Sequence, residues 1–85
     1  MKVDALAVRS TVLSQFAQVA KEQHKSLAPL TDELVLVDSG MDSLCLAIVV
    51  ARLEDALGID PFTATDGDFP VTLGDFIRMY ADATR

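Results

Sequence analysis

The segment DSGMDSLCLAIVVARLEDALG, residues 38–58, decides the fold and raises the question of function. Asp42 and Ser43 stand directly before eight consecutive apolar residues, Leu44 to Ala51. Gly58 follows the run, and glycine is a favoured residue just beyond a helix end. The segment therefore predicts a helix that begins near Asp42, with Ser43 in its first turn, and stops at Gly58.

This helix has two apolar faces when its residues are placed at 100° intervals. One face spans about 100°, the width expected of a core-facing stripe, and is predicted to pack into the core. It consists of Leu46, Val49, Val50, Leu53 and Leu57. The opposite face is also apolar and consists of Leu44, Ala47, Ile48 and Ala51. An apolar face turned to water usually marks a place where a partner docks. The alternative is that residues 26–41 or 59–70 fold over it.

Two further helices flank this one. Apolar residues at helical spacing predict a first helix from Asp4 to about Gln23, with an inner face of Val8, Val12, Leu13, Phe16, Val19 and Ala20. His24, in its last turn, is expected to be a solvated surface residue. Thr72 and Asp75 form a near capping box that opens the last helix. The inner face of that helix is Leu73, Phe76, Ile77 and Tyr80.

The connecting segments carry turn residues. Pro29 ends the first helix, and Gly40 supplies a turn before the second. The apolar stretch 34–37 is expected to be a loop pinned across the core, since a lone strand would lack a partner. Residues 59–70 leave room for one short helical turn at most, and TDGDF at 65–69 is expected to be a turn because it lacks the ligand spacing of a calcium loop.

The expected fold is therefore all-α: one domain over residues 1–85, built as a small four-helix bundle with three long helices and a short irregular third. A hydrophobic fraction of 51% supports a folded core in so short a chain. The single cysteine, Cys45, excludes an intramolecular disulfide and a cysteine-rich zinc site, and favours the reduced cytoplasm. Cys45 itself is expected to be a small apolar filler or an accidental free thiol.

Charge and hydropathy restrict the partners. Residues 1–31 hold four basic and two acidic residues, whereas residues 32–85 hold three basic and eleven acidic ones. An acidic surface repels phosphate backbones, so nucleic-acid binding is not expected. No apolar run approaches the roughly 20 residues that cross a bilayer, so membrane insertion is not expected either.

Ser43 could be a helix cap, a nucleophile or an attachment point. Asp42 or Ser39 would serve equally well as the cap, and Asp42 there would place Met41 and Leu46 at the ends of a hydrophobic staple. A nucleophilic serine needs a base, and the chain offers only His24, with no G-x-S-x-G elbow around the serine. Attachment through the exposed hydroxyl is the favoured interpretation. The helix N-terminus would favour a phosphate ester there.

The elements DSGMDSL, LEDALG and, at the last helix, P-x-T-L-G-D-F-I together resemble the acyl and peptidyl carrier proteins over nearly the whole chain. The resemblance implies a non-catalytic, monomeric carrier whose Ser43 bears a 4′-phosphopantetheine arm, transferred from coenzyme A by a phosphopantetheinyl transferase. The arm would hold an acyl or aminoacyl group as a thioester. An acyl- or aminoacyl-loading ligase would supply this cargo, and the arm would present it to acyl-processing enzymes. The implied docking surface comprises Met41, Asp42, Leu44, Ala47, Ile48 and Ala51, and no metal is implied.

Some residues depart from the family pattern. Cys45 and Ile48 stand where fatty-acid carriers commonly have acids on the outer face, and Arg52 adds a positive charge. These departures favour a specialised fatty-acyl, polyketide or aminoacyl carrier whose partners dock by apolar contact. SGMDS also lacks the Gly-Gly pair common in peptidyl carriers. The alternative function is a non-enzymatic helical interaction module that uses the same apolar face with an unmodified serine.

Overall fold

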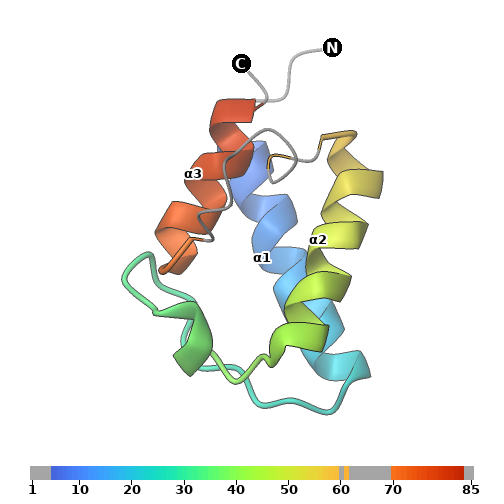
Figure 1. Cartoon of the computed structure of the whole chain (residues 1–85), viewed down its shortest axis with the longest axis vertical. Helices are drawn as coiled ribbons and strands as arrows, with labels where there is room; N and C mark the ends of the chain where they lie inside the picture. Colours follow the sequence, from blue (N-terminus) through green and yellow to red (C-terminus); the bar gives the residue numbers. More distant parts are fainter. Residues whose placement is uncertain (1–4, 60, 62–69, 84–85) are drawn as a thin grey trace.

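The computed structural model describes residues 5–59, 61 and 70–83, and these residues form an all-helical fold. Its α-helices are α1 (Ala5–Glu22), α2 (Ser43–Leu57) and α3 (Leu73–Ala83), and a single 3-10 turn, η1 (Leu36–Asp38), precedes α2. Both α2 and α3 run antiparallel to α1 (Figure 1). The all-α prediction is confirmed with three α-helices. The expected short helix and the TDGDF turn fall almost wholly on residues outside those described.

Helix α1 packs against both α2 and α3. Its buried residues recur every three or four positions, as an amphipathic helix requires, and are Val8, Val12, Phe16, Val19 and Ala20. Leu13, also predicted to face inward, is partly buried against the same core. Phe16 meets Phe76 of α3 edge to face, with ring centroids 5.4 Å apart. The inner face predicted for α1 is therefore confirmed, and it joins the other two helices.

Helix α3 begins with the predicted capping box. The Asp75 N–H donates to Thr72 Oγ1 at 3.1 Å, and the Thr72 N–H donates to Asp75 Oδ2 at 3.4 Å. Each side chain thus satisfies a backbone donor that a helix start leaves unpaired. All four residues predicted for the inner face of α3 are buried: Leu73, Phe76, Ile77 and Tyr80.

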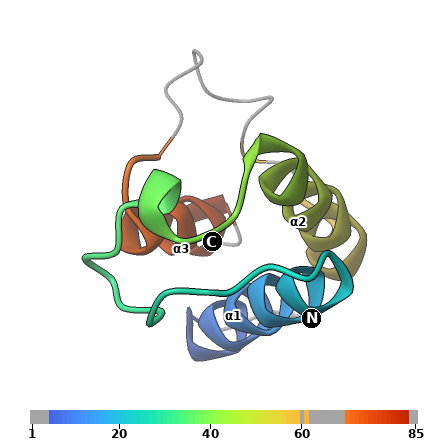
Figure 2. The ribbon, with the colours of Figure 1, turned by 90° about the horizontal axis from the view of Figure 1, so that it is seen from below.

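The segment between α1 and α2 closes one end of the bundle (Figures 1 and 2). The Leu36 N–H donates to the Val71 carbonyl at 2.9 Å, and the Leu73 N–H donates to the Leu34 carbonyl at 2.8 Å. Val35 and Thr72 form an isolated antiparallel bridge at this point. The segment is thus a pinned loop, as expected, with Leu36 buried. A single bridge to the residues before α3 provides the strand partner that the sequence did not reveal.

The end of α1 is set by His24, which adopts a left-handed backbone conformation with φ of 57°. The His24 N–H donates to the Lys21 carbonyl and the Lys25 N–H donates to the Ala20 carbonyl, at 3.3 and 2.8 Å. These two bonds are the Schellman arrangement that ends many helices. His24 is exposed, as predicted, and its role is to turn the chain out of the helix.

Two glycines with positive φ offer a test of how tightly the loop is packed. Gly40 has φ of 94°, and a Cβ there would overlap with the Ser26 carbonyl oxygen, whereas Gly58, with φ of 72°, has open space around it. Gly58→Ala should cost about 1–2 kcal/mol of unfolding free energy, from the backbone conformation alone. Gly40→Ala should cost a further ~1–3 kcal/mol because the loop must move away from the methyl group.

Urea unfolding of the two variants beside the wild type measures both costs. Equal losses of unfolding free energy in the two variants would show that the close approach of Gly40 to Ser26 does not constrain the loop between α1 and α2.

Candidate functional site

Ser43 is the first residue of α2, and its side chain is exposed. The preceding residue, Asp42, is the N-cap, with an extended backbone (φ −82°, ψ 178°). Asp42 Oδ1 accepts a hydrogen bond from the Cys45 N–H at 2.8 Å, which satisfies a donor of the first turn. The helix start is therefore capped by Asp42, and the Ser43 hydroxyl is not needed for that task.

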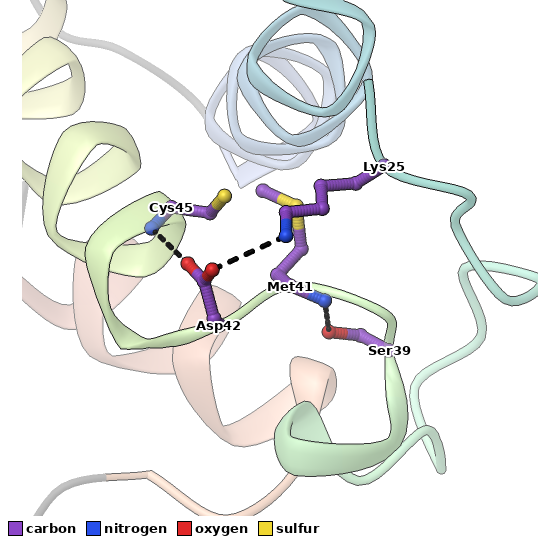
Figure 3. A network of polar contacts seen from close by, with 5 residues as sticks. All are labelled: Lys25, Ser39, Met41, Asp42 and Cys45. Carbon is purple, nitrogen blue, oxygen red and sulfur yellow. Dashed lines mark hydrogen bonds and ion pairs between the residues drawn. The ribbon is translucent and has the colours of Figure 1, made fainter. Parts of the chain in front are cut away.

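The second oxygen of the Asp42 carboxylate faces a cation. Lys25 Nζ lies 3.3 Å from Asp42 Oδ2 and reaches it from the loop after α1 (Figure 3). The Cys45 N–H and then Lys25 lower the pKa of Asp42 from its usual 3.8 to about 2. The carboxylate beside Ser43 is consequently ionised at neutral pH.

Ser39 holds the turn that leads into this site. It is fully buried, its Oγ donates to the Leu36 carbonyl at 2.6 Å, and the Met41 N–H donates to that Oγ at 3.3 Å (Figure 3). Its carbonyl accepts from the Ala28 N–H at 3.0 Å. Of the two candidate caps, Asp42 therefore caps α2, while Ser39 fixes the turn in front of it.

The residues expected to form the docking surface differ in exposure. Asp42, Leu44, Ala47 and Ala51 are exposed, and Leu44 retains 63% of its accessible area. Ile48 is partly buried and packs against the core. Met41 is only 4% exposed, so its side chain belongs to the core beneath the helix start. Placing Met41 on the surface was incorrect, because the turn fixed by Ser39 directs it inward.

Cys45 also lies on the other side of the helix from the one expected. It is 1% exposed and, with Val49 and Leu53, forms the fully buried line of α2, flanked by the partly buried Leu46, Val50 and Leu57. Burial, and then the neighbouring Asp42, raise the pKa of the thiol above its usual value. The interpretation of Cys45 as an apolar filler is therefore confirmed, and its assignment to the outer face was wrong.

Arg52 does not add an unpaired positive charge to α2. Its guanidinium donates to the Glu22 carboxylate through both terminal nitrogen atoms, Nη1 to Oε2 at 3.0 Å and Nη2 to Oε1. The pair links α2 to the end of α1 across thirty residues of sequence. Hydrogen bonding to Arg52 lowers the pKa of Glu22, and the same contact raises the pKa of Arg52.

The described part of the chain lacks two other features. No group of three or more His, Cys, Asp or Glu side chains there could hold a metal ion. None of the helices there is both long enough and apolar enough to pass through a membrane.

Comparison with known proteins agrees with the exposed serine at a capped helix start. The family profile described as a phosphopantetheine attachment site matches residues 10–66, about two thirds of the chain. The chain belongs to this family. Phosphopantetheine-attachment domains carry a covalently bound 4′-phosphopantetheine group and are generally non-catalytic, which agrees with the resemblance to acyl and peptidyl carriers. Searches against curated proteins and against solved structures gave no significant match.

One contact of this phosphopantetheine-attachment domain was not anticipated. Lys25 stands seventeen residues before Asp42, and no motif in the sequence connects the two. A lysine in a connecting loop gives no signal that it will face a particular carboxylate. The pairing results from the Schellman turn at His24 and from the path of the loop that follows.

The lowered pKa of Asp42 predicts a specific acid dependence. Because the folded-state pKa, about 2, lies below the unfolded value of 3.8, the charge of Asp42 stabilises the fold above pH ~4 and ceases to do so as the pH falls toward 2. Asp42→Asn retains a good N-cap but has no charge. The stability difference between wild type and Asp42→Asn should therefore be constant near neutral pH and shrink between pH ~4 and ~2.

Urea unfolding of both proteins at a series of pH values measures this difference. Glu22, whose pKa is also lowered, is present in both proteins, so its contribution cancels in the difference. A difference that stays the same down to pH ~2 would contradict the assigned environment of Asp42.

Proposed function

We propose that the chain is a single-domain, cytoplasmic acyl or aminoacyl carrier protein. In this proposal it holds its cargo as a thioester on a 4′-phosphopantetheine arm attached to Ser43 and presents it to partner enzymes without catalysing a reaction itself. The observation that carries the proposal is the exposed Ser43 at the start of α2, within the segment that matches the phosphopantetheine family.

The other serines of the matched segment are less suitable. Ser39 is fully buried, with its Oγ already bonded within its own turn. Ser10 and Ser14 are exposed but lie within α1, and Ser26 lies in the following loop. Ser43 alone among them opens a helix, where the unpaired N–H groups and the positive end of the dipole favour a phosphate.

The arm supplies a terminal thiol that forms the thioester with the cargo. The chain's own part is to hold the hydroxyl in an accessible and fixed place. Asp42 fixes the hydroxyl by capping α2, so that the helix begins at Ser43. The turn at Ser39 holds the residues just before it. The buried Cys45 does not offer a competing nucleophile at the surface.

The proposed docking surface consists of Asp42, Leu44, Ala47 and Ala51, with Ile48 at its inner edge. Leu44 is next to Ser43 and highly exposed, so an enzyme that reaches the arm would meet its side chain first. An exposed leucine at such a point gains binding energy when a partner buries it. Apolar contact of this kind suits a specialised fatty-acyl, polyketide or aminoacyl pathway, with a phosphopantetheinyl transferase, a loading ligase and acyl-processing enzymes as partners.

Attachment is tested by intact mass after incubation with coenzyme A and a broad-specificity phosphopantetheinyl transferase. The wild type and Ser14→Ala, a control at another exposed serine, should each gain the mass of one phosphopantetheine, and Ser43→Ala should gain nothing. Since Asp42 caps α2, Ser43→Ala should change the unfolding free energy by no more than ~0.5 kcal/mol. A folded wild type that gains no mass would refute the carrier proposal and leave a binding module as the alternative.

The docking surface is tested with two matched leucine variants. Leu44 and Leu6 are both exposed, at 63% and 79%, and Leu6 lies at the start of α1. Leu44→Ala should raise the KM of the transferase about 5–50-fold, which corresponds to burial of one apolar side chain, and Leu6→Ala should leave it unchanged. Equal KM values for the two variants would place the docking surface elsewhere on the molecule.

A further inference from the structure

Lys25 is held in position through both its backbone and its side chain. Its backbone N–H is bonded to the Ala20 carbonyl in the Schellman turn that ends α1, and its Nζ lies 3.3 Å from Asp42 Oδ2. Figure 3 shows its side chain extending from the loop toward the start of α2. The ammonium therefore lies beside the residue that immediately precedes Ser43.

The ion pair leaves Lys25 able to bind a second anion. An ammonium group has three N–H donors, and the ion pair with Asp42 engages it from one side, through Oδ2. The side chains of Lys25 and Asp42 retain 37% and 53% of their accessible area, so the pair is open to water and to a group attached nearby. Asp42 Oδ1 is already occupied by the Cys45 N–H, so the carboxylate cannot turn freely to follow the lysine.

Attachment at Ser43 would bring a second negative charge to this place. A phosphodiester carries one negative charge, and the Cα atoms of residues 42 and 43 are only about 3.8 Å apart. The ionised Asp42 carboxylate and the phosphodiester would therefore repel each other, and a cation near both would offset this repulsion. Lys25 is the cation that the fold already places there.

We propose that, in the phosphopantetheine-bearing protein, Lys25 contacts the phosphodiester on Ser43 together with the Asp42 carboxylate, and so limits the orientations of the base of the arm. This inference rests on the proposed function, because it requires an arm on Ser43. Lys25 acts here as a positioning residue, and it joins the end of α1 to the attachment point at the start of α2.

The described arginines that form ion pairs with other elements, Arg52 and Arg9, are poorly placed for this task. Arg52 is bound by Glu22 and stands nine residues after Ser43. At 1.5 Å per residue, that separation corresponds to about 13 Å along the helix axis. Arg9 pairs with Asp32, which lies earlier in the loop between α1 and α2. Among the ion pairs of the described residues, the Lys25–Asp42 pair alone includes a neighbour of Ser43.

The test compares the stability of each protein with and without the arm. Wild type, Lys25→Met, Lys25→Arg and Lys21→Met are prepared in both forms, and intact mass verifies that each is fully modified. Lys21 is a matched control because it is an exposed lysine in the last turn of α1, and its replacement changes the net charge equally. Urea unfolding gives the ratio of the folding equilibrium constants with and without the arm.

Lys25→Met should lower this ratio about two- to fivefold relative to wild type, the range of an exposed charge pair. Lys25→Arg should restore most of it, and Lys21→Met should leave it unchanged. In about 1 M salt, where screening acts within about 3 Å, the effect of Lys25→Met should largely disappear. The ³¹P resonance of the phosphodiester should also move in Lys25→Met and not in Lys21→Met.

The two proposals fail in different ways. A wild-type protein that accepts no arm would refute the proposed function, and this inference with it. Modified proteins in which Lys25→Met and Lys21→Met give the same ratio, and the same ³¹P resonance as wild type, would refute the role of Lys25 alone.

Discussion

The Asp42 carboxylate is the point on which the arrangement around Ser43 depends. One oxygen accepts a hydrogen bond from the Cys45 N–H and so fixes the first turn of α2. The other oxygen faces Lys25, which lies in the turn that ends α1. A single side chain thus determines where the helix begins and how the preceding loop lies against it. Ser43 is the next residue, so Asp42 also fixes where the Ser43 hydroxyl lies, and that hydroxyl takes no part in the cap.

The loop between α1 and α2 also completes α3. Its carbonyl groups at Leu34 and Asp32 accept from the Leu73 and Gly74 N–H groups, which are the first two donors of α3. Together with the Thr72–Asp75 box, these bonds supply acceptors for the donors at a helix start, which have no partner within the helix. The same loop therefore orders the starts of two helices that lie far apart in the sequence.

The sequence predicted the features that depend on neighbouring residues. The capping box of α3 and the limits of α2 depend on residues a few positions apart, and both were confirmed. The core-facing side of α2 was also predicted correctly, with Val49 and Leu53 fully buried, but Cys45 was misplaced. Residues 44–51 are apolar all round, so periodicity alone cannot decide on which side a residue between the two faces lies. Helix α2 packs against α1, and Cys45 is buried in the core that these helices share. The Lys25–Asp42 and Arg52–Glu22 pairs join residues seventeen and thirty positions apart, so no local pattern predicts them.

The buried position of Cys45 has a practical consequence for handling the protein. It is the only cysteine in the chain, and it lies beneath the helix start with 1% of its area exposed. A thiol-directed reagent applied to the native protein would meet an accessible thiol only where an arm has been attached to the described residues. Fluorescent or affinity labels could thus be directed to the arm without first replacing the native cysteine.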